Sequence, residues 1–228
     1  MHPETFPDTF CITVKIMRVY YAIVSQPLND FDFKRYLKQM PSAIQQKIAR
    51  YKNWEDAHTS LIGKLLLIQA LQDSGLQETD LSVLTYNKYG RPSVPGIMDF
   101  NISHSETLAV CAIAANGSIG IDAEALKPIN KTDFYNCWTP AEAKAIYHDP
   151  EDYKTFYGYW TKKEAVVKAI GNGLNIPLTD IEIKGDLATV AHYGNWHVKE
   201  IPLSEKYIVH MAAKEPYKAP VEVIQKEF

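Results

Sequence analysis

The sequence has few cysteines, and no motif in which cysteine would bind a metal or build a disulfide framework. Cys11, Cys111 and Cys137 are odd in number, lie far apart and form no C-x-x-C pair. This excludes a disulfide scaffold and a cysteine zinc cluster, and it fits a reducing compartment. We therefore expect a cytoplasmic protein.

Long apolar runs and an excess of positive charge are also missing. No stretch approaches the roughly 18–20 apolar residues that span a bilayer. The opening segment has two prolines and two acidic residues but no basic n-region, so no secretory signal is predicted. The net charge is −3, whereas nucleic-acid-binding domains are usually strongly basic. We expect neither a membrane nor a nucleic acid as partner.

The common nucleotide-binding loops are absent from the sequence too. It contains no G-x-x-x-x-G-K-[ST] loop and no G-x-G-x-x-G turn. The zinc-binding motif H-E-x-x-H is absent as well. Hydrophobic residues nevertheless make up 46% of the 228 residues and charged residues 22%, which is typical of a globular protein. The length allows one large domain or two small ones.

Hydrophobic periodicity and turn residues predict an alternation of helices and strands. The Asn116-Gly117 pair is a strong hairpin signal between two strands. Thr139 and Glu142 form a capping box for one helix, and Gly171 ends another. We expect strands over 18–24, 100–102, 107–115 and 118–124, helices over 43–52, 54–73, 140 onward and 151–170, and three or four antiparallel strands within 181–213.

An internal repeat divides the chain into two similar halves. Asp56-Ala57 with Ile62-Gly63 matches Glu164-Ala165 with Ile170-Gly171 at an offset of 108, and Glu106, Val110 and Ala114 match Glu205, Val209 and Ala213 at an offset of 99. The sequence thus predicts an α+β fold made by pseudo-two-fold duplication of two α/β halves, with a site between them. We expect an N-terminal extension over 1–16, halves over 17–117 and 118–213, and a C-terminal tail over 214–228.

Two acidic residues near the middle of the chain are candidate metal ligands. Asp122 and Glu124 are two positions apart in a predicted strand, so their side chains project from one face. Neighbouring carboxylates repel unless a cation lies between them, and all-oxygen ligation suits Mg²⁺. A solvated acidic strand end is the simpler explanation for this triplet taken alone.

Two further groups of residues could take part in chemistry. Trp160, Glu164 and Lys168 follow one another at intervals of four, so they share a helix face. Ser103 and His104 are adjacent at the end of a strand and would point to opposite faces, which argues against a nucleophile–base pair. Either could still contact a phosphate. An exposed ion pair and a surface serine and histidine remain the alternatives.

Taken together and in this order, these segments resemble a 4′-phosphopantetheinyl transferase of the Sfp (surfactin-synthetase-activating) type. The resemblance spans about residues 17–213. Its hallmark pair is (I/V)-G-(I/V)-D-x-(E/D) at 119–124 and (F/W)-(S/C/T)-x-K-E-(A/S)-x-x-K at 160–168. The supporting segments are Arg50-Tyr51, Trp54–Ala57 with Gly63, Gly90–Pro92 and Phe100–Ser105.

The resemblance implies an enzyme that moves the phosphopantetheine arm of coenzyme A to a serine of an apo acyl or peptidyl carrier protein. Adenosine 3′,5′-bisphosphate would be released, and the chain would act as a monomer. Asp122, Glu124 and Glu164 would hold Mg²⁺, or Mn²⁺ in its place. Glu164 would serve as the base, and Lys168 would steady the leaving phosphate. The expected coenzyme A contacts are Lys47, Arg50, Arg91, Ser103, His104, Lys163 and Lys168.

One departure from the family pattern concerns the 3′-phosphate contacts. Relatives often have arginine where this chain has Thr59, and Lys64 or Lys52 could compensate. Three other classes of protein stay open at this point. One is an Mg²⁺-dependent hydrolase of a nucleotide or phosphoester, and another is a non-catalytic module that binds coenzyme A or a carrier protein. The third is a two-domain protein whose acidic and basic motifs are solvated faces.

Overall fold

The computed structural model describes residues 17–76, 81–94, 98–115, 117–217 and 219–228. The expected N-terminal extension over 1–16 and Asn116 of the expected hairpin turn lie outside the described residues. The elements up to residue 114 are β1 (Met17–Ile23), α1 (Asp30–Leu37), α2 (Ser42–Ile48), α3 (Trp54–Gln72), η1 (Leu81–Val83), β2 (Thr85–Tyr86), β3 (Pro92–Ser93), β4 (Asp99–Ser105) and β5 (Leu108–Ala114).

The remainder of the described chain contains one long helix, one short helix, the whole of the second sheet and one further strand of the first sheet. Its elements are β6 (Ile119–Ala125), η2 (Lys131–Cys137), α4 (Pro140–Ile146), α5 (Tyr153–Ile170), η3 (Gly173–Asn175), η4 (Leu178–Asp180), β7 (Ile181–Lys184), β8 (Leu187–Val190), β9 (Gly194–Glu200), β10 (Tyr207–Ala213) and β11 (Glu222–Gln225). The capping box of Thr139 and Glu142 starts α4 as predicted. Gly171 ends α5 with a φ of 77°.

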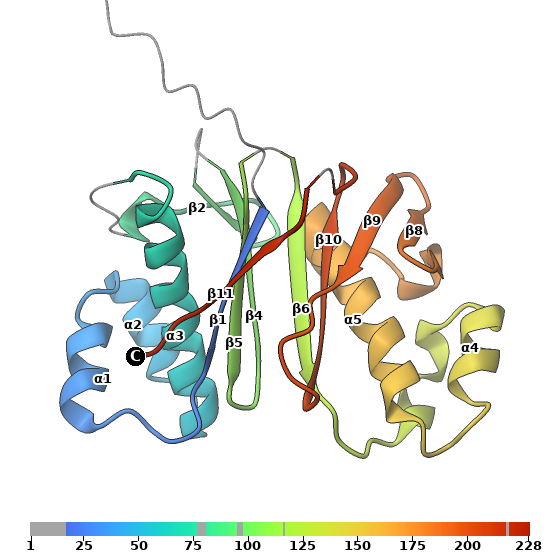
Figure 1. Cartoon of the computed structure of the whole chain (residues 1–228), viewed down its shortest axis with the longest axis horizontal. Coiled ribbons are helices and arrows are strands. Elements are labelled where there is room, and N and C mark those ends of the chain that lie inside the picture. The colour runs from blue at the N-terminus through green and yellow to red at the C-terminus, as the bar shows by residue number, and fades with distance from the viewer. Residues whose placement is uncertain (1–16, 77–80, 95–97, 116, 218) are drawn as a thin grey trace, which may run out of the picture.

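Two sheets lie face to face in the middle of the molecule (Figure 1). Their strand orders are β11-β1-β5-β4 and β6-β10-β9-β8-β7. The α3 helix packs on the outer side of the first sheet and α5 on the outer side of the second. Val19 and Val110 of one sheet join Ile121 and Met211 of the other in a single apolar cluster. The fold is thus α+β, with the sheets inside and the helices outside.

The two halves share one arrangement of strands. In the first half β5 lies between β1 and β4, and in the second half β10 lies between β6 and β9. The pairing of Met17 with Ala114 has its counterpart in the pairing of Ile119 with Ala213. Helix α5 begins 99 residues after α3, and β10 begins 99 residues after β5. The offset of 99 is therefore confirmed, whereas the offset of 108 is wrong in register because it does not superimpose the helices.

The predicted hairpin between β5 and β6 is also wrong, because these strands belong to different sheets. Side chains of β4 instead bind the backbone of β6, where the two sheets meet. Since side chains alternate along a strand, positions 99, 101 and 105 face the same way. Their oxygens accept hydrogen bonds from three backbone N–H groups of β6: Asp99 Oδ2 from Ile119 (2.8 Å), Asn101 Oδ1 from Ile121 (2.9 Å) and Ser105 Oγ from Ala125 (3.1 Å).

The segment expected as a polar tail returns to the first half of the chain. Strand β11 pairs in parallel with β1. Arg18 Nε donates to Glu222 Oε2 at 2.7 Å, and Tyr21 Oη donates to Gln225 Oε1 at 2.9 Å. The sequence pattern predicts no strand at Glu222–Gln225.

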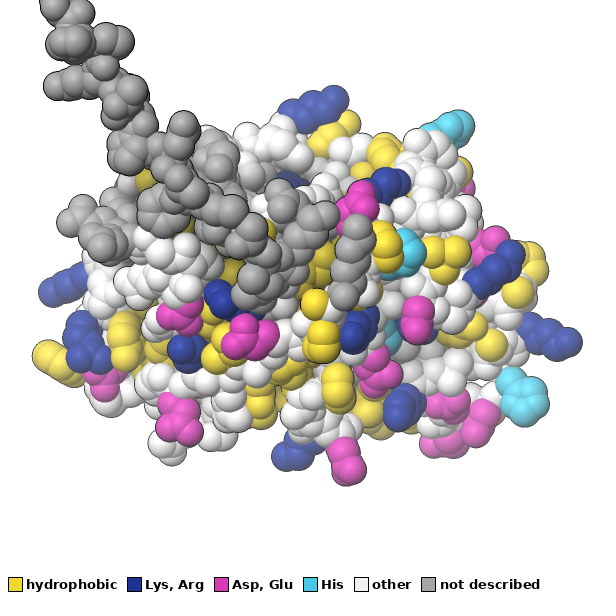
Figure 2. All heavy atoms as spheres, turned by 45° about the horizontal axis from the view of Figure 1, so that its top comes forward, with side chains coloured by type: hydrophobic (Ala, Val, Ile, Leu, Met, Phe, Trp, Pro, Cys, Tyr) yellow, Lys and Arg dark blue, Asp and Glu magenta, His cyan; other side chains and the backbone are white. Residues whose placement is uncertain are grey.

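The described residues include no helix long and apolar enough to cross a membrane. On the face seen in Figure 2, basic and acidic side chains are interspersed, with hydrophobic side chains between them.

Candidate active site

Strand β6 lies directly against the backbone of α5, and a glycine makes this approach possible. A Cβ atom on Gly120 would lie 2.1 Å from the carbonyl oxygen of Ala165 and 2.4 Å from the amide nitrogen of Ala169. Side chains at alternate positions share a face, so Asp122 and Glu124 follow Gly120 toward α5. The glycine therefore decides how close the carboxylates come to the helix that carries Glu164 and Lys168.

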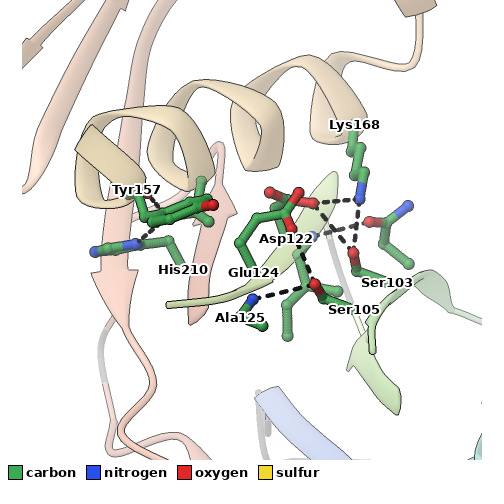
Figure 3. Close-up of polar contacts among 11 residues, drawn as sticks. Ser103, Ser105, Asp122, Glu124, Ala125, Tyr157, Lys168 and His210 are labelled. Carbon is green, nitrogen blue, oxygen red and sulfur yellow. Dashed lines mark hydrogen bonds and ion pairs between the residues drawn. The ribbon is translucent and has the colours of Figure 1, made fainter. Parts of the chain in front are cut away.

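Lys168 and Asp122 form an ion pair at the centre of this site (Figure 3). Lys168 Nζ lies 2.6 Å from Asp122 Oδ1 and donates to Ser103 Oγ at 2.9 Å. Ser103 Oγ in turn donates to the same Asp122 oxygen at 3.1 Å. The structure thus brings together three predicted site residues from β4, β6 and α5.

Two more carboxylates belong to the same group. Burial raises the pKa of Glu124, and the negative charge of Asp122 raises it further. Burial likewise raises the pKa of Glu164, with Asp122 as the next cause and Glu124 as a smaller one. Both carboxylates are therefore harder to ionise than a solvated glutamate, as expected where negative charges gather away from water.

The donor set fits a divalent cation. Asp122 is 4% exposed, and its Oδ2 is a buried oxygen without a hydrogen-bond partner among the described residues. An unpartnered buried carboxylate oxygen is costly, and oxygen ligands of this kind suit Mg²⁺. Within the described part of the chain, no three His, Cys, Asp or Glu side chains already stand as a metal-ligand group.

A basic group lies on the other face of β4. His104 points away from Ser103, and its ring meets Tyr51 edge-on with a centroid distance of 6.5 Å. Burial and the charge of Lys64 lower the pKa of His104. Burial and the nearby Lys47 lower the pKa of Lys64 to about 8. Positive charges that repel one another in a partly desolvated place fit an anionic ligand such as a phosphate.

Several residues named from the sequence stand elsewhere or have another partner. Lys163 is fully buried, its Nζ lies 2.6 Å from Glu142, and it donates to two backbone carbonyls. The structure therefore does not bring Lys163 to the carboxylate cluster around Asp122. Thr59 is buried too and donates to the carbonyl of Glu55 at 2.6 Å. Arg50 follows α2 and is exposed.

Arg91 is bound within the protein rather than standing free. Its Nη2 lies 2.6 Å from Asp99 Oδ2, and its Nε donates to the carbonyl of Lys168 at 3.0 Å. Only 17% of its side chain is exposed. In the structure the guanidinium is therefore held by the protein itself, and the contact of Arg91 with a coenzyme A phosphate stays a prediction.

Sequence reasoning missed Ser105, which donates to Glu124 Oε2 at 2.9 Å. The signal was available, because Ser105 lies two positions after Ser103 on the same strand and so shares its face.

Beside this site, a cavity of about 240 Å³ is lined by Tyr89 and Pro92 from the first half and by Glu164 and Val167 of α5. Both halves thus contribute to one pocket.

This fold and this site define an enzyme of phosphate chemistry: two similar α+β halves meet at a cluster of carboxylates, and a basic group lies nearby. Family models match both halves. The model of the 4′-phosphopantetheinyl transferase N-terminal region covers residues 26–116, and that of the 4′-phosphopantetheinyl transferase superfamily covers residues 118–218.

Curated relatives agree with the family models. A 4′-phosphopantetheinyl transferase of Bacillus subtilis is 32% identical over 173 residues, which is 74% of this chain and 76% of that protein. The transferase Sfp of B. subtilis strain 168 is 30% identical over the same shares. The transferase gsp of Aneurinibacillus migulanus is 34% identical over 66% of this chain and 65% of its own.

The chain belongs to the 4′-phosphopantetheinyl transferases, and it is of the Sfp type. It is therefore an enzyme of the holo-acyl-carrier-protein synthase kind, which takes phosphopantetheine from coenzyme A and transfers it to carrier proteins. The fold and family predictions from the sequence are confirmed.

Proposed function

We propose that this enzyme transfers 4′-phosphopantetheine to a serine of an apo acyl or peptidyl carrier protein in an Mg²⁺-dependent reaction that releases adenosine 3′,5′-bisphosphate. The observation that supports this most is the buried Asp122 carboxylate. One of its oxygens binds Lys168 and Ser103, and the other has no hydrogen-bond partner among the described residues.

Asp122, Glu124 and Glu164 are the residues that would hold the cation, with Mn²⁺ as an alternative to Mg²⁺. When bound, the cation would neutralise charge on the coenzyme A pyrophosphate and on the departing phosphate. These carboxylates suit that role because burial and mutual repulsion make their shared negative charge unfavourable without a cation.

Glu164 is the proposed general base. Its raised pKa brings it closer to neutral pH, which makes a carboxylate a better proton acceptor. It would take the proton of the carrier serine while the serine oxygen forms a bond to the β-phosphorus of coenzyme A. The bond from that phosphorus to the bridging oxygen breaks, and the bisphosphate leaves with the electron pair.

Lys168 would donate a hydrogen bond to the departing phosphate. Its Nζ already lies between Asp122 and Ser103, so it is held at the place where that charge would form. Phosphoryl transfer depends mainly on such positioning and on charge neutralisation.

The basic group beside His104 is the proposed site for the nucleotide phosphates. It would comprise His104 and Lys47, and Lys64 would add charge where the family arginine is missing. Ser103, on the opposite face of β4, would contact the pyrophosphate beside Lys168, and the exposed Arg50 would reach the 3′-phosphate region. We further propose that the enzyme acts as a monomer in the cytoplasm, and that neither nucleic acid nor membrane takes part.

The test is the mass of an apo carrier protein incubated with enzyme, coenzyme A and Mg²⁺. We expect a gain of one phosphopantetheine with the wild type, and loss of this gain with Glu164→Gln and Asp122→Asn. Lys144→Gln, at an exposed position of α4, is the control and should match the wild type. Breakdown of coenzyme A without a carrier would indicate a hydrolase instead, and coenzyme A binding without turnover would indicate a binding module.

A further inference from the structure

Arg91 joins three elements that build the active site. Its Nη2 donates to Asp99 Oδ2 in β4 at 2.6 Å and to the carbonyl of Ile119 in β6 at 2.9 Å. Its Nε donates to the carbonyl of Lys168 in α5 at 3.0 Å. One guanidinium group thereby links a strand of the first half to a strand and a helix of the second.

The segment before Arg91 is shaped to reach the end of α5. Asn87 Oδ1 accepts hydrogen bonds from the backbone N–H groups of Tyr89 and Arg91, each at 2.9 Å. Asn87 Nδ2 donates to the carbonyl of Gly171 at 2.9 Å. A Cβ atom on Gly171 would lie 2.4 Å from Arg91 Cδ, so the glycine leaves room for the arginine.

Electrostatics favours a cation at this position. The last four carbonyl groups of a helix have no partner within the helix, and they give its C-terminus a partial negative charge. Helix α5 ends at Ile170, so the Lys168 carbonyl is one of these groups. Arg91 satisfies it with a charged donor, while Asp99 holds the guanidinium in place.

We propose that Arg91 is a positioning residue that fixes the last turn of α5 and thereby places the Lys168 ammonium on Asp122 and Ser103. The carbonyl bound by Arg91 and the ammonium bound by Asp122 belong to the same residue, so fixing the backbone restricts where Nζ can lie. This inference rests on the proposed role of Lys168, and it gives Arg91 a function other than the 3′-phosphate contact expected from the family resemblance.

The first test compares coenzyme A with 3′-dephospho-coenzyme A as substrates of Arg91→Lys. Lysine has one nitrogen and cannot reproduce the fork of arginine. We expect kcat/KM to fall by about 100-fold, the order of loss caused by a small misplacement of a catalytic group. The preference for coenzyme A over the dephosphorylated form should stay unchanged. Loss of that preference would show that Arg91 binds the 3′-phosphate and would overturn the proposal.

The second test is a double-mutant cycle with Lys168→Gln. If Arg91 acts through Lys168, Arg91→Lys should change kcat/KM by less than about threefold once Lys168 is replaced, because the two effects are not additive. Full additivity would overturn the inference. If Lys168→Gln alone matched the wild type, the proposed function of Lys168 would fail instead, so the two failures are distinguishable.

Two further variants keep the proposal testable. Arg35→Lys changes an exposed arginine paired with Asp32 on α1, and it should match the wild type. If Arg91→Lys does not fold, Asn87→Asp takes its place, because it keeps an oxygen for the two backbone N–H groups and replaces the donor to Gly171 by a carboxylate oxygen that the Gly171 carbonyl repels. We expect a smaller loss of kcat/KM in the same direction, and an unchanged value would overturn the proposal.

Discussion

Ser105 of β4 donates a hydrogen bond to Glu124 of β6 at 2.9 Å and accepts one from the backbone N–H of Ala125 at 3.1 Å. A hydroxyl group of the first half thus orients a carboxylate of the second half. Groups that orient metal ligands in this way commonly affect affinity for the metal.

We predict that Ser105→Ala weakens Mn²⁺ binding by about 10- to 100-fold, since Glu124 loses its fixed orientation. Calorimetric titration of the protein with Mn²⁺, without coenzyme A or carrier, measures this directly. Ser25→Ala, at an exposed serine after β1, is the control. Equal Mn²⁺ affinity in wild type and Ser105→Ala would show that this hydrogen bond does not orient a metal ligand.

The close approach of β6 to α5 predicts opposite effects at two glycines. Gly120→Ala places a Cβ atom against the backbone of α5, so we expect a loss of about 1–3 kcal/mol or more in unfolding free energy. Gly158→Ala, within α5, meets no atom within 4 Å and should stabilise by about 0.5–1 kcal/mol, because alanine favours the helix. Urea unfolding of both variants checks this, and equal effects would contradict the packing described.

The buried pair of Lys163 and Glu142 predicts a structural role for this lysine. Lys163→Met leaves the Glu142 charge buried without its cation, and breaking such a pair costs about 3–5 kcal/mol. Lys162→Met is the control, because the ammonium of this neighbour donates to the carbonyl of Gly185 at the surface. In protein that remains folded, KM for coenzyme A should not change. A stable Lys163→Met variant with a raised KM would support the phosphate contact first expected.

His210 predicts a loss of stability in acid. Burial lowers its pKa to about 3, and its Nδ1 lies 2.7 Å from Thr161 Oγ1. His210 stays neutral in the folded state, whereas the unfolded chain takes up a proton there below pH 6.5. The unfolding free energy is therefore at its full value above pH 6.5 and decreases as the pH falls from there toward 3. The slope is about 1.4 kcal/mol per pH unit.

Glu124 and Glu164 have the opposite effect, because their raised pKa values stabilise the folded state as the pH falls. The effect of His210 is therefore measured by comparing the wild type with a His210 variant. His210→Gln should flatten the acid limb of unfolding free energy against pH, and His148→Gln, at an exposed position, should leave it unchanged. If His210→Gln keeps the wild-type slope, another group causes the acid loss.

The helix face of α5 shows where sequence reasoning succeeded and where it stopped. Glu164 and Lys168 are four residues apart and share a face, as predicted from helix geometry. Lys163 precedes Glu164 by one residue, which turns it by about 100° around the axis. Helical periodicity therefore places Lys163 on a different side of α5 from Glu164 and Lys168. It does not reveal that Glu142 packs against the side on which Lys163 lies.

The sequence by itself determined the features that depend on near neighbours. Alternation along a strand put Asp122 and Glu124 together, a capping box began α4, and Gly171 ended α5. The order of motifs was enough to indicate the family. Each of these signals lies within a few residues, where local geometry allows few alternatives.

Only the tertiary structure decided which distant groups meet. It separated β5 from β6 although a turn signal joins them, brought β11 back beside β1, and directed Arg91 to the end of α5 rather than to solvent. These outcomes depend on how two sheets bury their apolar faces against each other. Such packing joins residues far apart in the chain, 77 positions for Arg91 and Lys168 and 204 for Arg18 and Glu222, and no local pattern in the sequence records it.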